Sequence, residues 1–325
     1  MNEAPYALSM EQVDDFCREG YLVVHSVFGD ADLQPVIDEL TDIVTLRARV
    51  LVERGELSRT YADEGFAGQL AAISQETDKL ALSIWNGVLS GAGIFRVISH
   101  PRLLDIAEQF CGPEIIASSV YRLRPKIPNY GYGAVPWHQD SSYFEPYCDR
   151  ALVLTVWTPL VNATEENGCL WVIPKSHIYP IVPHRLHESG KYLEIDKDNL
   201  PHGEPVVCEV PKGGVLLMTN RTVHGSFENR TRGVRWSMDL RYQGAALPTN
   251  APITRLEGEM QANIEAGVPA ACYPPEADFL VRSQVRPQEV IATAEAFNAL
   301  RANHLGGEVT NRWGVTWAAP KETGF

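Results

Sequence analysis

The residue pattern of positions 114–243 constrains the fold most, because short runs of strand-forming residues are separated there by Pro, Gly and Asn. The runs are rich in β-branched, aromatic and other apolar residues, and they comprise Ile115–Leu123, Ala151–Trp157, Gly168–Ile173, Val206–Val210, Gly214–Thr219 and Val234–Tyr242. Many short strands at such spacing are typical of a β-sandwich or a jelly roll. The sequence therefore predicts a mainly β core in this region.

Helical patterns flank this core on both sides. Ser9 and Gln12 have the spacing of a capping box, and Gly20 is placed to end the helix that follows. The other predicted flanking elements are a strand at Tyr21–Val24 and helices at about Asp32–Gly55, Pro101–Gly112 and Pro287–His304.

Because the sequence contains no internal repeat or low-complexity tract, we expect residues 1–325 to form one domain. It would consist of a mainly helical flank (1–113), a catalytic core (114–243) and a C-terminal segment of loops and helix (244–325). Residues 248–273 are expected to form loops and short helix. The C-terminal segment could act as a lid over the core or as a homodimer contact.

Composition narrows the function. The net charge of -13, from 41 acidic and 28 basic residues, argues against nucleic acid or an anionic membrane as the main partner. The sequence shows no bilayer-spanning apolar stretch and no signal peptide, which favours a cytoplasmic protein. Its six cysteines are scattered without a CxxC pair, so we expect them to be reduced and structural.

The segment Trp137-His138-Gln139-Asp140 carries the clearest chemical signal. A His and an Asp two residues apart on an extended strand point the same way and can bind one metal ion together. His224 is the best candidate for a third ligand, because it follows the apolar run Gly214–Met218, which is typical of a buried strand. Two imidazoles and one carboxylate on one face of the metal form the facial triad of non-haem Fe(II) oxygenases.

The segment Val234–Tyr242 alternates between apolar residues and a polar set, Arg235, Ser237, Asp239 and Arg241. An ordinary strand with one solvated face would give the same pattern. In the alternative, Arg235 and Ser237 hold a carboxylate near the metal, since a guanidinium fork binds carboxylates bidentately. Arg241 is the next candidate for this clamp.

These motifs, taken together with Glu166–His177 and the stretch His224–Asn229, resemble the phytanoyl-CoA dioxygenase family of Fe(II)- and 2-oxoglutarate-dependent oxygenases. The resemblance extends from about Ser9 to Tyr242. One departure is Lys175, where the family often has Gly, which puts the local turn in question but not the metal site.

The resemblance implies a double-stranded β-helix, which is a cupin-like jelly roll flanked by helices. It implies that His138, Asp140 and His224 bind Fe(II), and that Arg235, helped by Ser237, binds the distal carboxylate of 2-oxoglutarate. Thr155 and Phe144 are expected beside the cofactor.

The implied reaction consumes O2 and releases succinate and CO2. Because Asp140 completes the triad, the favoured outcome is hydroxylation of an unactivated C–H bond; related halogenases lack this carboxylate. The expected substrate is a small organic metabolite, such as an organic acid or a natural-product intermediate, rather than an acyl-CoA.

Two other functions remain open at this stage. A cupin-like metal-dependent isomerase or lyase would not need the Arg235 clamp, and a non-catalytic jelly-roll binding protein would be expected to have lost the triad. The cations of Tyr121–Lys126 could attract an acidic substrate at the pocket mouth or could lie on a solvated strand edge. Structural or surface roles are expected for the remaining histidines, His177 in its turn and His25, His100, His184, His187, His202 and His304.

Overall fold

The computed structural model describes residues 6–86, 89–119, 121–130, 133–144, 149–188, 192–246, 278–303, 308–310 and 316–318. The α-helices of this part are α1 (Met10–Glu19), α2 (Asp30–Glu53), α3 (Gly65–Ile73), α4 (Lys79–Asn86), α5 (Ala92–Ile98), α6 (Pro101–Cys111) and α8 (Ala294–Asn303). Short 3-10 helices are η1 (Ala62–Glu64), η3 (Asp140–Tyr143), η5 (Ser176–Ile178), η6 (Lys197–Asn199) and η8 (Pro287–Glu289).

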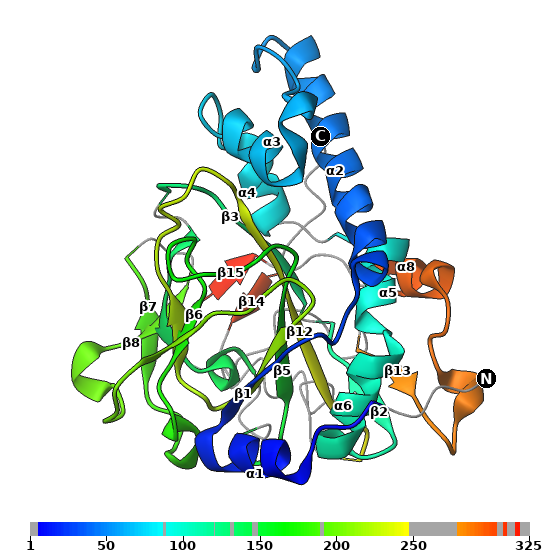
Figure 1. Cartoon of the computed structure of the whole chain (residues 1–325), viewed down its shortest axis with the longest axis vertical. Helices are drawn as coiled ribbons and strands as arrows, with labels where there is room; N and C mark the ends of the chain where they lie inside the picture. Colours follow the sequence, from blue (N-terminus) through cyan, green and yellow to red (C-terminus); the bar gives the residue numbers. More distant parts are fainter. Residues whose placement is uncertain are drawn as a thin grey trace.

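Two antiparallel sheets form the core of the molecule (Figure 1). The large sheet has the strand order β1-β10-β5-β12-β2-β13, with β3 also paired to β12. Its strands are β1 (Tyr21–Val24), β2 (Ile115–Ala117), β3 (Arg122–Lys126), β5 (Leu154–Pro159), β10 (Val215–Thr219), β12 (Arg235–Gly244) and β13 (Phe279–Arg282).

The small sheet has the order β4-β11-β6-β9. Its strands are β4 (Val135–His138), β6 (Leu170–Val172), β9 (Val206–Cys208) and β11 (His224–Ser226). The described residues also contain two separate antiparallel strand pairs, β7 (His184–Leu186) with β8 (Leu193–Ile195), and β14 (Glu308–Thr310) with β15 (Thr316–Ala318). Two facing antiparallel sheets confirm the predicted jelly-roll core.

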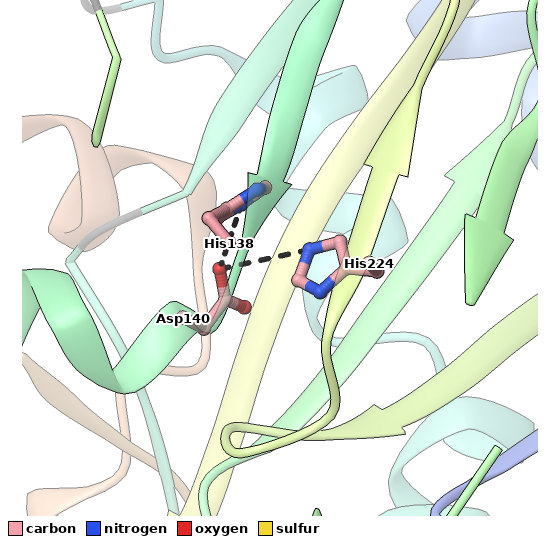
Figure 2. A group of neighbouring side chains, drawn as sticks. All are labelled: His138, Asp140 and His224. Carbon is pink, nitrogen blue, oxygen red and sulfur yellow. Dashed lines mark ion pairs between the residues drawn. The ribbon is translucent and has the colours of Figure 1, made fainter. Parts of the chain in front are cut away.

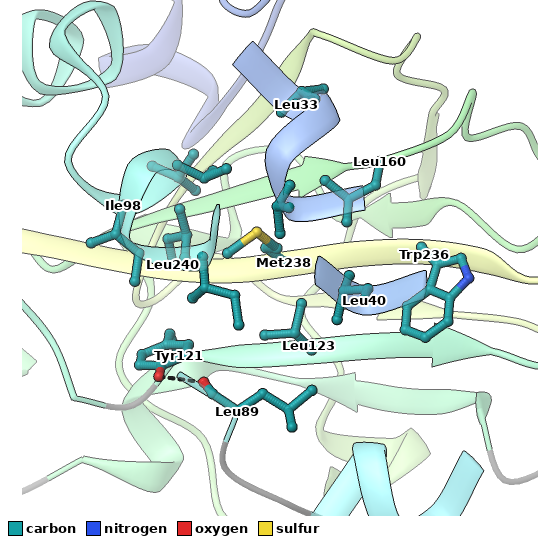
Figure 3. Packing of buried hydrophobic residues seen from close by; sticks show 14 of the residues in the cluster. Leu33, Leu40, Leu89, Ile98, Tyr121, Leu123, Leu160, Trp236, Met238 and Leu240 are labelled. Carbon is teal, nitrogen blue, oxygen red and sulfur yellow. Dashed lines mark hydrogen bonds between the residues drawn. The ribbon is translucent and has the colours of Figure 1, made fainter. Parts of the chain in front are cut away.

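Helices α2, α5 and α6 cover the outer face of the large sheet (Figure 1). Figure 3 shows this layer from close by, with Leu33 and Leu40 of α2 near Trp236, Met238 and Leu240 of β12. The apolar residues of β12 thus bury one face of the strand against the helices. Because successive side chains of a strand point to opposite faces, the polar residues of β12 point into the space between the two sheets.

A second apolar cluster fills part of the space between the sheets. Trp157 and Met218 of the large sheet pack there with Leu170 and Val172 of the small sheet. The two sheets are therefore joined by a dry contact beside the polar residues of β12, which leaves those residues in a protein interior rather than in water.

Most of the predicted elements are confirmed. Ser9 caps α1 through both hydrogen bonds of the capping box, and Gly20 ends the helix at φ 82°. The predicted helices at 32–55 and 101–112 are α2, which begins two residues earlier than expected, and α6. The predicted C-terminal helix is shorter, because η8 and α8 occupy separate parts of it.

One strand prediction needs correction. Ile115–Leu123 is not one strand, because β2 ends at Ala117 and β3 begins at Arg122. In between, the backbone N–H groups of Ser118 and Ser119 donate to the Arg241 carbonyl and the Asp278 carboxylate instead of continuing one ladder.

The structure bears on three further sequence predictions. Lys175 adopts the left-handed conformation at φ 62°, so this chain keeps the turn that the family usually builds with Gly. Cys17, Cys111, Cys169 and Cys208 are free thiols, whereas Cys148, Cys272, His304 and residues 248–273 lie outside the described residues. Across the described chain, every helix is too short or too polar to cross a membrane.

Candidate metal centre and anion pocket

His138, Asp140 and His224 come together in the structure, from two strands and a 3-10 helix (Figure 2). His138 ends β4 and His224 begins β11, and the two residues are direct partners across this strand pair. Asp140 is not on the strand, as the sequence suggested, but begins η3. Because Gln139 remains extended, with φ -113° and ψ 134°, Asp140 still points to the same side as His138.

The geometry of the three side chains suits one metal ion. One candidate ligand atom from each residue lies within 4.8 Å of the others, and all three residues are buried. Asp140 Oδ1 lies 3.8 Å from His138 Nε2 and 3.9 Å from His224 Nε2, and the two imidazole centroids are 4.3 Å apart. Three ligands on one side leave the opposite side for other molecules.

Backbone carbonyls fix the orientation of both imidazoles. Nδ1 of His138 lies 2.8 Å from the Pro136 carbonyl oxygen, and Nδ1 of His224 lies 2.9 Å from that of Thr222. A proton on each Nδ1 donates to these carbonyls and leaves the Nε2 lone pair facing the shared centre. Such contacts are the usual second layer of a histidine metal site.

The protonation states also suit a cation. Burial, followed by the neighbouring His224, lowers the pKa of His138 to about 3, so the imidazole is neutral at pH 7. Burial alone would raise the pKa of Asp140, but Arg241 and both imidazoles hold it below its ordinary value. The donor set is therefore one carboxylate and neutral imidazole, the forms that bind metals.

Thr155 and Arg241 hold the carboxylate of Asp140. Thr155 Oγ1 donates to Oδ2 at 2.6 Å, while Arg241 donates from Nε to Oδ2 at 3.1 Å and from Nη2 to Oδ1 at 2.8 Å. These two residues are direct partners on β5 and β12. Thr155, expected as a cofactor neighbour, thus contacts the candidate ligand itself, and Arg241 lies on Asp140 rather than in a separate clamp.

His184 is a functional candidate that the sequence analysis left among structural histidines. Its Nε2 accepts the backbone N–H of Gln139 at 3.0 Å, and its Nδ1 lies 2.7 Å from the Val182 carbonyl oxygen. The Gln139 side chain in turn donates to the Arg221 carbonyl and accepts from Val182 N–H. The residue between the two candidate ligands is therefore held on both sides, a role for which the sequence offered no signal.

Arg235 and Ser237 lie on the inner face of β12, both buried, which excludes the solvated strand face considered above. Arg235 Nη1 donates to Ser237 Oγ at 2.6 Å and Nη2 donates to the Gly168 carbonyl at 3.1 Å. Arg235 Nε has no hydrogen-bond partner among the described residues. Burial lowers the pKa of Arg235 to about 10, which leaves the group charged at pH 7.

The Tyr121–Lys126 segment lies partly beside Arg235, because β3 pairs with β12. Arg124 forms an ion pair with Asp239 at 3.2 Å, whereas Lys126 is fully buried opposite Arg235. Lys126 therefore lies on neither a pocket mouth nor a solvated edge. The sequence could have indicated this position of Lys126. Arg122, Arg124 and Lys126 are spaced two residues apart, so their side chains share one face of a strand.

Of the aromatic residues near the triad, Phe144 lies beside the candidate metal centre, whereas Trp137 packs against another aromatic ring. Phe144 is buried at the end of η3 with the Arg241 guanidinium 5.6 Å from its ring centroid, which places it beside the candidate metal centre. Trp137 precedes His138 on β4 and packs against Phe227, with ring centroids 5.9 Å apart. His177 lies outside the site and packs on Gly20, with Nε2 3.1 Å from the Cys17 carbonyl oxygen.

Comparison with known proteins gives matches over most of the chain. The family model for phytanoyl-CoA dioxygenase (PhyH) matches residues 16–237. The peroxisomal phytanoyl-CoA dioxygenase of Bos taurus is 27% identical over 271 residues, which cover 80% of this chain and 75% of the relative. A probable alpha-ketoglutarate-dependent hypophosphite dioxygenase of Stutzerimonas stutzeri is 26% identical over 228 residues, covering 68% of this chain and 73% of the relative.

Among solved structures, the non-heme monooxygenase ThoJ in its apo form superimposes with a TM-score of 0.50. It is 18% identical, and the match covers 89% of this chain and 98% of that protein. This similarity supports the fold.

Proposed function

Because this chain belongs to the phytanoyl-CoA dioxygenase family, we propose that it hydroxylates an unactivated C–H bond of a small organic metabolite. The family resemblance inferred from the sequence is confirmed, and the chain is an Fe(II)- and 2-oxoglutarate-dependent dioxygenase. The isomerase, lyase and binding-protein alternatives lose their support with this membership.

We assign the iron ligands to His138, Asp140 and His224. Their convergence in one buried group, with both Nε2 atoms and a carboxylate oxygen facing one another, is the observation that carries the proposal. Retention of the carboxylate favours hydroxylation, because Asp140 fills the position that a halide would need. His184 and Gln139 keep the segment between the first two ligands in place.

We assign the distal carboxylate of 2-oxoglutarate to Arg235 and Ser237. Their buried donors fit a carboxylate that enters from solvent, and they include the Nε of Arg235, which has no hydrogen-bond partner among the described residues. When bound, iron and 2-oxoglutarate together activate O2, with release of succinate and CO2, and supply the oxidising equivalent for the hydroxylation. The protein positions both groups and keeps the pocket dry.

The substrate, cellular location and assembly remain proposals. We favour a small organic acid or natural-product intermediate, a cytoplasmic enzyme, and residues 244–325 as a lid or dimer contact. The one-domain proposal is supported by β13, which pairs with β2 and so joins residues 279–282 to the large sheet. A single cooperative unfolding transition would test the one-domain proposal.

An anaerobic titration tests the function itself. Fe(II) and 2-oxoglutarate should together give the weak visible charge-transfer band that appears when the keto acid chelates protein-bound iron. The band should disappear in His224→Ala and persist in His25→Ala, which removes an exposed imidazole far from the triad in sequence. Iron binding without a band in the wild-type protein would contradict the keto-acid site, and a band in His224→Ala would contradict the ligand assignment.

A further inference from the structure

Two buried basic side chains occupy directly opposed positions of a strand pair beside the candidate metal centre. Lys126 of β3 and Arg235 of β12 are direct partners in the antiparallel register, and their residues are 0% and 2% exposed. Like charges in directly opposed positions repel, and burial removes the water that would screen them. Asp239, the acidic residue on the same face of β12, is paired with Arg124 instead. The described residues offer Lys126 and Arg235 no carboxylate within 4.0 Å.

The hydrogen bonds of Lys126 suit an amine with two protons. Nζ donates to Ser226 Oγ at 2.7 Å and to the Phe227 carbonyl oxygen at 2.5 Å. An ammonium group carries three N–H donors, and a neutral amine carries two. The described residues therefore satisfy the neutral form, while a third proton would need an acceptor that enters the pocket.

The hydroxyl groups point to the same missing acceptor. Ser226 accepts from Lys126, and Ser237 accepts from Arg235. A hydroxyl that accepts from a cation must direct its own hydrogen elsewhere. Both serines are buried, so an anion between the two cations would receive two hydroxyl donors as well as N–H groups.

Ser226, which accepts from Lys126, also lies at a suitable distance from the candidate metal centre. Ser226 is two residues beyond His224 on β11, so the two side chains share one face of the strand. Two residues of strand span about 6.6 Å. A five-carbon diacid can bridge this separation, with its keto end at the triad and its distal carboxylate at Lys126.

We propose that Lys126 is a second anchor for the distal carboxylate of 2-oxoglutarate, opposite Arg235, and that its amine takes up a proton from solvent as this carboxylate binds. The inference rests on the function proposed above. The proton adds to the Nζ lone pair, the product is an ammonium–carboxylate pair, and no other bond is made or broken. Binding of the cosubstrate is thereby linked to pH.

The charges around Lys126 support this linkage. Burial, and then the positive charge of Arg235, hold the pKa of the Lys126 amine well below its ordinary value. Asp239 on β12 and Glu228 after β11 act in the opposite direction but do not outweigh burial. The thiol of Cys169, which also faces Lys126, is neutral at pH 7 because burial raises its pKa to about 11. A carboxylate in contact would reverse the balance.

Gly168 provides the space for this arrangement. Its φ is +79°, and a Cβ at this position would lie 2.7 Å from Lys126 Cδ and 2.6 Å from the Phe227 carbonyl oxygen. The same glycine supplies the carbonyl that accepts from Arg235. Gly168 thus leaves space for the Lys126 side chain, and its carbonyl orients the Arg235 guanidinium.

Calorimetry of the Mn(II)-loaded enzyme under nitrogen can count the proton. 2-Oxoglutarate is titrated at pH 7 in buffers of different ionisation enthalpy, and the slope of observed heat against that enthalpy gives protons taken up. Both carboxylates of 2-oxoglutarate are already ionised at this pH. We expect net proton uptake for the wild-type protein and uptake close to zero for Lys126→Gln, which keeps an N–H donor but cannot take up a proton.

The dissociation constant gives a second readout. Lys126→Gln should bind 2-oxoglutarate about 10- to 100-fold more weakly at pH 7, as expected for one lost charge-assisted contact. Its Mn(II) affinity should be unchanged. Raising the pH from 7 to 9 should weaken 2-oxoglutarate binding more in the wild-type protein than in the variant. Lys126→Met serves as a second variant if the amide perturbs folding, which thermal unfolding will show.

The outcomes separate this inference from the proposed function. Lys79→Gln removes an exposed lysine at the start of α4 that is paired with Glu56, and it should keep the wild-type proton uptake. If wild-type enzyme binds 2-oxoglutarate but Lys126→Gln shows the same uptake and affinity, the role of Lys126 is refuted while the oxygenase stands. If the wild-type enzyme does not bind 2-oxoglutarate at all, the proposed function fails first.

Discussion

Replacing Arg241 by Met should destabilise the metal-free protein and leave most of that loss recoverable by a divalent metal. The guanidinium makes two hydrogen bonds to Asp140, at 2.8 and 3.1 Å, and the two side chains are 10% and 2% exposed. Met retains much of the aliphatic stem, so the main change is a buried carboxylate without its cation.

The magnitude follows from this geometry. Removing one partner of a buried ion pair costs about 3–5 kcal/mol, and the remaining bond from Thr155 favours the lower end. The entropy of unfolding of a 325-residue chain is about 0.7 kcal/mol per kelvin near Tm, so the expected fall in Tm is about 4–7 °C. A metal ion at the triad would supply positive charge to the same carboxylate and should reverse most of this fall.

Thermal unfolding with and without Mn(II), under nitrogen, measures both effects. The matched control is Arg124→Met, which breaks the more exposed pair with Asp239 and should lose less stability, with no recovery beyond the wild-type response to metal. A fall in Tm of less than 1 °C for Arg241→Met would refute the energetic argument. An equal fall in the presence and absence of metal would show that Asp140 is not a metal ligand.

Three other substitutions test the packing and electrostatics of the fold. Gly168→Ala should destabilise the protein by about 2–3 kcal/mol in urea unfolding, because its φ is +79° and the new Cβ would approach the Phe227 carbonyl to 2.6 Å; wild-type stability would contradict this close approach. Trp236→Ala should cost about 3–5 kcal/mol, since the fully buried indole stacks on Phe66 between β12 and the helices, and a loss below 1 kcal/mol would show that the layer collapses around the cavity. Burial raises the pKa of Asp278 to about 6, so the folded state holds a proton that the unfolded state releases, and this stability is present below pH 3.8 and lost as pH rises to 6. Asp278→Asn should therefore gain about 2–3 kcal/mol relative to wild type between pH 4 and pH 7.5, and parallel stability curves would contradict the shift.

Short-range sequence patterns were sufficient to predict many of the helices and strands. Ser9, Gln12 and Gly20 define both ends of α1 through contacts within one or two turns, and the alternation of residues 234–242 defines the two faces of β12. The family motifs likewise named the three candidate metal ligands before their geometry was known. Such features depend on backbone capping and strand periodicity, which act over a few residues.

Other features depended on contacts between distant segments. The sequence placed Asp140 on a strand, but the backbone turns into η3, and Arg241 and Thr155 reach its carboxylate from two other strands. Lys126 could be read as a solvated cation until the register of β3 with β12 placed it opposite Arg235 in a dry interior.

The sequence by itself thus determined which side chains could bind a metal and a carboxylate, and which face of each strand they occupy. Only the tertiary structure decided which of them meet, and that Lys126 and Arg235 have no carboxylate within ion-pair distance in the part of the chain that is described. The physical reason is that burial and pairing, which set charge state and hydrogen-bond demand, arise between residues such as Lys126 and Ser226 that lie 100 positions apart in the chain.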